Sequence, residues 1–351
     1  MVQSPVIRED LDRAWASIAA IWPDLAGRRI FISGGTGFIG NWVLESLLDA
    51  ESRCRSGIQV TVLTRDPEAF LRRRQHLARH PAVTLLTGDV RSFSTPEGRF
   101  DFVIHAAADT SVALNEIRPD VMFDIIVSGT KRVLEFAASS GVRRMLFVSS
   151  GAVYGIRPDA NELVPEEARA SGEDFPAHTA YGAAKREAES LCDRAGRNGE
   201  LAIVVSRCFA FVGPYLPLDA HYAVGNFILD VSMGAPIRVK GDGTARRSYL
   251  YASDLAIWLW TILCRGKACQ AYNVGSENVV AISELAEVLR DLSGGKSQVR
   301  IERTGTPAVA SSFYAPSTIR ARTELNLLET VPLRDALERT LRWVRESRPS
   351  V

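Results

Sequence analysis

A tyrosine and a lysine four positions apart are the side chains in this sequence best suited to moving a proton. They lie in the segment Tyr181-Gly182-Ala183-Ala184-Lys185. On a helix this spacing places both side chains on one face, one turn apart. A phenol with a pKa near 10 is a poor base at neutral pH, but a neighbouring cation favours its ionised form. The pair therefore predicts a general acid/base, although the same spacing occurs by chance in many helices.

A serine at the end of an apolar strand could act on the same reacting oxygen. Ser149 and Ser150 close the run that begins at Met145. Ligands of doubly wound sheets bind at the carboxyl ends of the strands. We interpret Ser150 as a hydrogen-bond donor to the reacting oxygen and not as a nucleophile. For Ser149, capping of a turn is an equally good interpretation.

Three glycines at three-residue spacing predict a phosphate-binding turn. Gly34, Gly37 and Gly40 stand where an apolar strand runs directly into a helix, in the string ISGGTGFIG. Glycines at these positions permit a tight turn and let backbone N–H groups approach a pyrophosphate. At the first strand-to-helix junction of an alternating pattern, this predicts a bound dinucleotide, with Phe38 and Ile39 also in contact with it.

The end of the second strand bears on which dinucleotide is held. An acidic residue there would bind both ribose hydroxyls, but this sequence has Thr64 and Arg65. A guanidinium suits a 2′-phosphate, so the pair favours NADP(H), with NAD(H) as the alternative. In the competing interpretation, Arg65 points to solvent and Asp66 caps the helix that starts at Pro67.

Two further strand ends are expected to contact the cofactor. Asp89 and Val90 follow the third strand, where a carboxylate could accept a hydrogen bond from the adenine amino group. Small residues follow the fourth strand, where the backbone would pass beneath the cofactor: Ala106, Ala107 and Ala108. Neither segment is specific by itself.

Strands and helices alternate through the first two thirds of the sequence. The expected strands are 29–33, 59–64, 83–87, 102–105, 145–149 and 202–206, and the expected helices between them are 42–50, 67–79, 117–140 and 183–197. Near-continuous apolar strands separated by helices predict a parallel sheet covered on both faces. The predicted fold class is α/β, a Rossmann-type doubly wound parallel sheet with a smaller α/β C-terminal lobe.

The same patterns predict the domain boundaries. Residues 1–27 form an N-terminal helical extension, and residues 28–206 form the dinucleotide-binding domain. Loops rich in glycine and proline follow, so we assign 207–249 and 277–351 to the second lobe. We expect the chain to rejoin the first domain at about 250–276.

Composition and charge exclude several classes of protein. The chain has 351 residues, 42 Lys+Arg against 41 Asp+Glu, and a net charge of +1, which gives no general attraction to nucleic acid or anionic membranes. Its cysteines are five in number and form no CxxC pair: Cys54, Cys192, Cys208, Cys264 and Cys269. We therefore expect a cytoplasmic protein with neither a disulfide framework nor a metal site.

Taken together, the motifs resemble one family. GGTGFIG, HAAA, SSGAVYG, YGAAK, RCFAFVGP and GDGTARRSYLYASD occur in this order. They are similar to the extended short-chain dehydrogenase/reductases that modify nucleotide sugars, the epimerase/dehydratase type, from about residue 28 to 346. The resemblance implies a catalytic triad of Ser150, Tyr181 and Lys185, a C-terminal lobe that binds a nucleoside diphosphate, and a homodimer formed through a four-helix bundle.

Departures from the family pattern narrow the range of reactions that this chain is expected to catalyse. Dehydratases of this family carry an Asp-Glu pair just after the triad serine or threonine, and decarboxylases keep a Glu close by. Here Gly151 and Ala152 occupy those positions and cannot move protons. This favours hydride chemistry at C4 of the sugar, in an epimerase or a 4-ketoreductase. The alternatives are a dehydratase or decarboxylase that uses an acid from another loop, and a dinucleotide-binding sensor without catalysis.

The second lobe offers three candidate contacts for the substrate. Asn226 and Arg247 resemble residues that hold the diphosphate, with Arg246 as a possible substitute for its neighbour. A guanidinium supplies the paired donors that a diphosphate needs. Arg320 is a candidate second cation. The RxFNxxGP pattern of the family has Ala210 in place of its asparagine, so contacts to the sugar are expected to differ.

Overall fold

A seven-stranded parallel sheet forms the centre of the protein, with the strand order β11-β6-β5-β4-β1-β2-β3. This computed structural model describes residues 4–108, 117–155, 162–168, 180–199, 201–220, 222–302 and 313–347. The strands are β1 Arg29–Ser33, β2 Gln59–Thr64, β3 Val83–Thr87, β4 Phe102–His105, β5 Arg144–Ser150, β6 Ala202–Cys208 and β11 Ala271–Val274. The chain order reverses between β1 and β4, where doubly wound sheets bind their ligands.

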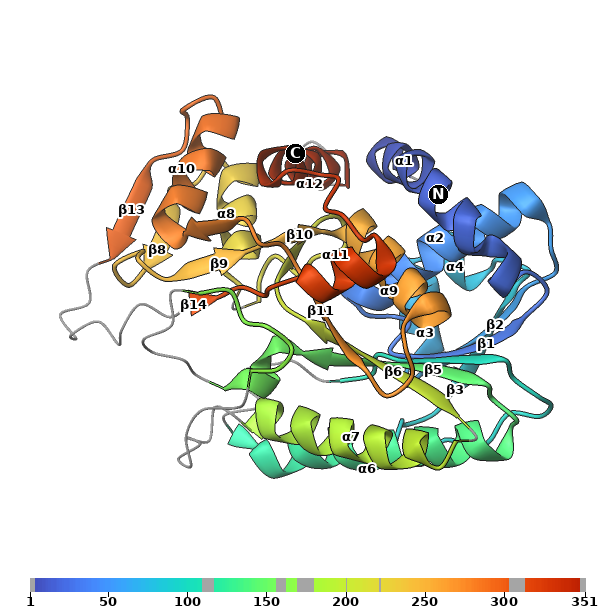
Figure 1. The fold of residues 1–351 in the computed structure, drawn as a ribbon. Helices are drawn as coiled ribbons and strands as arrows, with labels where there is room; N and C mark the ends of the chain where they lie inside the picture. The colour runs from blue at the N-terminus through green and yellow to red at the C-terminus, as the bar shows by residue number, and fades with distance from the viewer. Residues whose placement is uncertain are drawn as a thin grey trace.

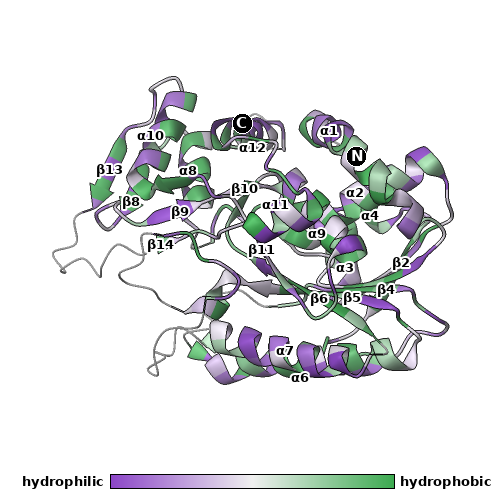
Figure 2. Cartoon of the chain, viewed as in Figure 1, coloured by the Kyte–Doolittle hydropathy of each residue, from purple (hydrophilic) through white to green (hydrophobic). Residues whose placement is uncertain are grey.

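Helices cover both faces of this sheet (Figure 1). On one face lie α6 Pro119–Ser139 and α7 Ala180–Arg197, and on the other lie α1 Pro5–Leu25, α2 Phe38–Cys54 and α9 Ala252–Arg265. Two separate apolar cores result, one centred on α2 and α9 and one on α6 and α7. In Figure 2 the strands between them are largely hydrophobic, as burial on both faces requires.

The six strands expected from the sequence are confirmed, and β5 and β6 each end later than expected, at Ser150 and Cys208. The helix expected over 67–79 is instead two short helices, α3 Pro67–Arg73 and α4 Gln75–Ala78. Arg74 interrupts them with an extended φ of −139°. Its guanidinium lies 4.1 Å from the ring centre of Tyr215, so a tertiary cation–π contact accompanies the break.

A smaller lobe is built from the C-terminal part of the chain. Its core lies among α8 Ala223–Ser232, β8 Ile237–Lys240, α10 Ile282–Leu292, β13 Val299–Glu302 and α12 Leu333–Ser347. A three-stranded sheet lies nearer the large sheet: β12 Val279–Ala281, β9 Arg246–Ser248 and β14 Phe313–Tyr314. The remaining short elements are η1 Gly151–Tyr154, β7 Phe211–Val212, β10 Leu250–Tyr251 and α11 Ile319–Leu325.

Helix α1 contacts both parts of the molecule. Its apolar stripe packs on α2 and α9, and Arg8 forms an ion pair of 2.8 Å with Asp49 of α2. On its other side, the fully buried Asp10 accepts hydrogen bonds from Tyr251, at 2.6 Å, and from Arg339 of α12, at 3.0 Å. Helix α1 therefore joins the part of the molecule around the large sheet to the C-terminal lobe.

Candidate active site

Strand β5 and helix α7 bring the three residues of the expected triad together. Ser150 is the last residue of β5, and its side chain is near enough to the phenol of Tyr181, in the first turn of α7, to favour a lower pKa for that phenol. Lys185 lies one turn further on. Its Nζ donates to the carbonyl of Val148 at 2.7 Å and lies 5.8 Å from the centre of the Tyr181 ring.

A glycine explains how these elements come so close. A Cβ on Gly182 would lie 2.5 Å from the carbonyl oxygen of Ala152, so only glycine lets α7 approach η1 at this point. The two serines at the end of β5 have different partners. Ser149 donates to Glu189 at 2.5 Å, and Glu189 also pairs with Arg207, which leaves Ser150 as the serine that contacts Tyr181.

Burial favours the uncharged form of both proton-carrying groups. It lowers the pKa of Lys185 to about 8 and raises the pKa of Tyr181 above its ordinary value. In each case the charged form loses solvation that the surrounding residues replace only in part. In the absence of further positive charge, Tyr181 is therefore a neutral phenol at pH 7.

A second tyrosine reaches the triad from the other lobe. Tyr314, on β14, places its hydroxyl oxygen 2.7 Å from where a Cβ on Gly151 would lie, and its ring centre lies 4.7 Å from that of Phe209. In the register of β14 against β9, Tyr314 pairs with Arg247, whose guanidinium carbon lies 5.8 Å from the ring centre. Sequence reasoning missed this residue because it belongs to no motif.

Position 151, directly after Ser150, has little space for a side chain. A Cβ on Gly151 would lie 2.7 Å from the Tyr314 hydroxyl oxygen and 2.8 Å from a ring carbon of Phe209. These contacts are shorter than carbon atoms tolerate, so a carboxylate at position 151 would require one of the two rings to move.

The glycine-rich turn has the form of a cradle for a dinucleotide. Gly34 has φ +76°, and a Cβ there would lie 2.5 Å from the carbonyl carbon of Ala106. A Cβ on Gly40 would lie 2.3 Å from the carbonyl oxygen of Gly34. Gly37 caps α2, and Phe38 and Ile39 form its first turn. This turn directs the unpaired N–H groups of the helix N-terminus toward the switch point.

A buried histidine joins the ends of β1 and β4 to the middle of α6 beside this cradle. His105 Nδ1 lies 2.6 Å from the hydroxyl of Ser33, and its Nε2 lies 3.0 Å from the hydroxyl of Thr130. Thr130 donates its own proton to the carbonyl of Ile126, so His105 Nε2–H donates and Nδ1 accepts. Burial lowers the pKa of His105 to about 3, which keeps it neutral.

The residues after β2 and β3 lie as follows. Thr64 is buried, Arg65 is exposed, and the Asp66 side chain caps α3 by accepting from Ala69 N–H at 2.8 Å. The capping role considered for Asp66 is thereby confirmed. Asp89 is paired with Arg91 at 2.8 Å, which lowers the pKa of its carboxyl.

The other expected cofactor contacts are small or apolar. Val90 is buried, and a Cβ on Gly129 would lie 2.8 Å from it. Ala106, Ala107 and Ala108 follow β4 beside the glycine turn and are half-buried.

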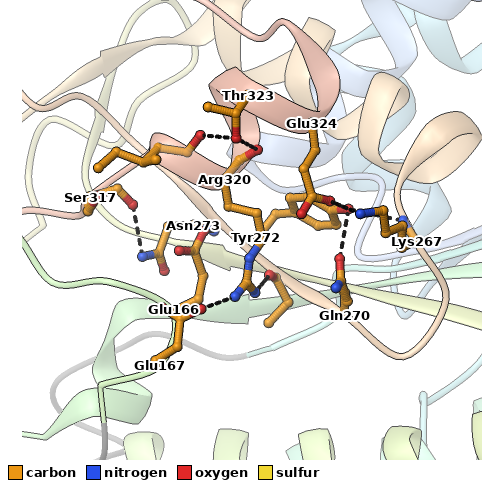
Figure 3. A network of polar contacts seen from close by, with 12 residues as sticks. Glu166, Glu167, Lys267, Gln270, Tyr272, Asn273, Ser317, Arg320, Thr323 and Glu324 are labelled. Atoms are coloured by element: carbon orange, nitrogen blue, oxygen red, sulfur yellow. Dashed lines mark hydrogen bonds and ion pairs between the residues drawn. The ribbon is translucent and has the colours of Figure 1, made fainter.

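The candidate substrate contacts separate into two groups. Arg247 is half-buried on β9 near Tyr314, and Asn226 is half-buried in the first turn of α8. Arg320 is placed elsewhere. Its guanidinium donates to the carbonyl of Ala271 at 2.7 Å and forms an ion pair with Glu167, beside the buried Asn273 (Figure 3). The structure therefore does not bring Arg320 together with the triad.

Within the ranges given above, no three or more His, Cys, Asp or Glu side chains are grouped so as to hold a metal ion. In the same part of the chain, no helix has both the length and the apolar character needed to cross a bilayer.

Comparison with known proteins agrees with this geometry. The model of the NAD-dependent epimerase/dehydratase family matches residues 30–275. A dTDP-glucose 4,6-dehydratase of Streptomyces niveus is 29% identical over 91% of this chain and 94% of its own length. A UDP-glucuronic acid decarboxylase of Xenopus tropicalis is 27% identical over 91% and 72%, and a UDP-glucose 4-epimerase of Oryza sativa is 29% identical over 81% and 82%.

The fold has equally clear relatives among solved structures. The dTDP-glucose 4,6-dehydratase DesIV of Streptomyces venezuelae, solved with NAD bound, superposes with a TM-score of 0.76. It is 25% identical, and the match covers 91% of this chain and 98% of that one. With a doubly wound sheet, a glycine cradle at its switch point and a family model that matches most of its length, this chain belongs to the NAD-dependent epimerase/dehydratase family.

Proposed function

We propose that this chain transfers hydride at C4 of the sugar of a nucleotide-diphosphate sugar, as a 4-epimerase or a 4-ketoreductase. The observation that carries the proposal is the backbone after Ser150. Gly151 and Ala152 offer no acid or base, and the Tyr314 hydroxyl and Phe209 fill the space that a larger side chain at 151 would need. Removal of water or carbon dioxide by the family's usual route calls for a carboxylate at this place.

The residues around Gly34 fit a dinucleotide. The cradle between Gly34, Gly40 and Ala106 is closed to any Cβ, as close approach of a pyrophosphate to backbone requires. A nicotinamide held by this cradle would supply the hydride acceptor or donor for the chemistry at C4. The choice of NADP(H) over NAD(H), made on Thr64 and Arg65, remains a prediction, since DesIV was solved with NAD.

Tyr181 supplies the proton chemistry in this proposal. As a phenolate it removes the proton from the sugar hydroxyl, and as a phenol it returns one to the carbonyl oxygen. Ser150 donates a hydrogen bond to the same oxygen. Lys185, held by the carbonyl of Val148, provides the positive charge that favours the phenolate.

Arg247 and Asn226 are the proposed contacts to the diphosphate. Arg247 lies beside Tyr314, whose hydroxyl is close to Gly151, so a sugar bound at Ser150 would place its diphosphate near β9. A guanidinium binds phosphate oxygens through paired donors. We assign Arg320 no part in binding, because Glu167 and the carbonyl of Ala271 already engage it.

Dehydration and decarboxylation are the competing reactions, favoured by the activities named for the relatives in Streptomyces and Xenopus. Either would need an acid from outside the segment 150–154. One set of incubations separates these reactions: the purified protein with UDP- and dTDP-hexoses and NAD(P), and with their 4-keto derivatives and NAD(P)H, followed by chromatography and mass spectrometry. A product of unchanged mass that elutes apart from the substrate supports an epimerase, and one heavier by two hydrogens than a 4-keto sugar supports a reductase. A product lighter by water or carbon dioxide overturns the proposal.

Two controls complete this test. Tyr181→Phe should abolish turnover while dinucleotide binding persists. Mass spectrometry of small molecules released on denaturation shows whether NAD or NADP is retained. A retained dinucleotide supports an epimerase, which recycles its cofactor in place. If no sugar is turned over and Tyr181→Phe leaves cellular function intact, a non-catalytic sensor is the better account.

We also propose the homodimer that the family resemblance implies. Helices α6 and α7 pack side by side on one face of the sheet, and Phe123 of α6 is exposed beside half-buried apolar neighbours. Two such pairs would make a four-helix bundle. Light scattering on wild type and Phe123→Glu tests this, since the charge should convert a dimer to a monomer.

A further inference from the structure

A lysine and a glutamate that stand one turn apart on α7 have separate partners. Lys185 and Glu189 have the i, i+4 spacing at which oppositely charged side chains form ion pairs on a helix. Instead, Lys185 Nζ donates to the carbonyl of Val148 at 2.7 Å, and Glu189 accepts from the hydroxyl of Ser149 at 2.5 Å. The two head groups therefore contact consecutive residues of β5. Burial lowers the pKa of Lys185, and Glu189 is near enough to oppose that shift.

Arg207 of β6 occupies the carboxylate of Glu189. Its Nη2 donates to Glu189 Oε2 at 2.7 Å, and its Nε donates to Oε1 at 3.1 Å. Its remaining nitrogen, Nη1, donates to the hydroxyl of Tyr154 and to the carbonyl of Glu166, both at 2.9 Å. Every nitrogen of the guanidinium is engaged, and the carboxylate meets the paired donors that arginine offers to such a group.

This arrangement matters because the proposed reaction needs the charge of Lys185 at Tyr181. The Val148 carbonyl is neutral, so it holds the ammonium without cancelling its charge. A free carboxylate one turn away would attract the ammonium and cancel its field at Tyr181. We propose that Arg207 is a positioning residue for the proton transfer: by binding Glu189, it keeps that carboxylate from pairing with Lys185. This inference rests on the proposed roles of Tyr181 and Lys185.

A pair that served only to hold the fold together would behave differently from one that controls charge. Only 17% of the Arg207 side chain and 13% of the Glu189 side chain are exposed, so water screens either charge poorly. Removal of one partner from such a pair leaves an uncompensated charge, whereas removal of both partners does not. The two interpretations therefore predict different results when Arg207 and Glu189 are changed together.

Arg207→Gln frees Glu189 and keeps a hydrogen-bonding side chain in place. We expect kcat per dinucleotide-binding site to fall about tenfold to a hundredfold, while the KM for sugar changes less than about twofold. Addition of Glu189→Gln should restore kcat to within about threefold of wild type, because no free carboxylate remains. A double variant as impaired as Arg207→Gln would overturn the inference, since the lost hydrogen bonds of Arg207 would then explain the defect.

Two further variants serve as controls for charge and for position. Arg207→Lys keeps a cation beside Glu189 with fewer donors, so kcat should stay within about threefold of wild type. Arg197→Gln breaks another ion pair of α7, the exposed one to Asp193 at 2.7 Å, and should leave kcat and its pH profile unchanged. A loss in Arg207→Lys as large as in Arg207→Gln would contradict the role of charge.

The pKa of Lys185 provides a readout without turnover. The chain has few lysines, which isotope-edited NMR of lysine-labelled protein can resolve: Lys131, Lys185, Lys240, Lys267 and Lys296. Lys185→Arg identifies the signal of interest. With NAD bound, the pKa of Lys185 should rise by about one pH unit in Arg207→Gln and fall in Glu189→Gln. It should return close to the wild-type value in the double variant.

These measurements separate the inference from the proposed reaction. Glu189→Gln keeps the test decisive if Arg207→Gln does not fold, because it predicts a shift of the opposite sign. A Lys185 pKa that is the same in wild type and in every variant would overturn the inference, whatever the substrate. The expected shifts without turnover of any nucleotide sugar would support the relation between the three charges and count against the proposed reaction alone.

Discussion

The carboxyl of Asp10 accepts a hydrogen bond of 2.6 Å from the hydroxyl of Tyr251, across a contact between the N-terminal helix and strand β10. Asp10 has no exposed surface, and Arg339 of α12 donates to its other oxygen at 3.0 Å. Burial outweighs these partners and raises the pKa of Asp10 from 3.8 to about 6. A contact that joins α1 to both parts of the protein is therefore sensitive to pH.

Asp10 should make stability fall as the pH rises through the weakly acidic range. Below 3.8 the group is protonated in both states; between 3.8 and about 6 it ionises in the unfolded chain first, so folding loses up to about 3 kcal/mol. Denaturant unfolding at pH 4 to 7 checks this. The difference in the free energy of unfolding between wild type and Asp10→Asn should decline over this range and then level off. Ser17→Ala, at an exposed position of the same helix without an ionisable group, should run parallel to wild type.

The charge on Lys185 should limit activity in alkaline solution. Burial lowers the pKa of Lys185 to about 8, and the neutral amine no longer supports the Tyr181 phenolate. We expect kcat/KM of the wild type to fall above about pH 8. Lys185→Arg should be less active than the wild type, but its kcat/KM should not fall in this range because the guanidinium stays charged. Lys267→Arg, on the surface, should leave the profile unchanged. A wild-type profile that is flat to pH 10 would contradict this role.

Any side chain at Gly151 should destabilise the protein. A Cβ there would meet the Tyr314 hydroxyl and Phe209 at less than 3 Å. We expect Gly151→Ala to lower the free energy of unfolding by about 1–3 kcal/mol, as overpacking does. In a Tyr314→Phe background the cost should be smaller, because the nearer obstacle has gone. Equal costs in the two backgrounds would show that the hydroxyl is not what fills this space.

Arg65 should decide the preference between cofactors. If its guanidinium binds the 2′-phosphate, Arg65→Ala should lower kcat/KM for NADPH by about tenfold to a hundredfold and leave NADH unaffected. Arg72→Ala, an exposed arginine on the neighbouring helix, is the control. A wild-type enzyme that prefers NADH would contradict the prediction from Thr64 and Arg65.

The two arginines first considered for the substrate should behave differently. Arg247→Ala should raise the KM for the nucleotide sugar at least tenfold, since it removes a charged partner of the diphosphate. Arg320→Ala should leave KM unchanged and lower stability by about 1 kcal/mol, because its hydrogen bond to Ala271 is structural. A raised KM in Arg320→Ala would restore it to the site.

The sequence predicted the sheet closely because its strands are short, apolar and bounded by glycine or polar residues. The same pattern could not show that Arg74 would break a helix to stack on Tyr215, since that contact crosses the fold. The triad was predictable because Tyr181 and Lys185 share a helix face and Ser150 ends a strand. Tyr314 was not, because its position depends on how β14 pairs with β9, which no local pattern encodes. For the same reason the sequence could not reveal that Glu167 would pair with Arg320.

The contacts of α1 also bear on how the protein is made. During synthesis α1 leaves the ribosome long before Tyr251 and Arg339, the two partners of Asp10. Contacts between segments so distant in the chain form late, because a long loop must close first. Until then, the apolar stripe of α1 has only α2 to pack against. A nascent chain cut off before β10 would therefore keep an unpartnered Asp10 in a half-covered helix, which marks it as incomplete to the cell's proteases and chaperones.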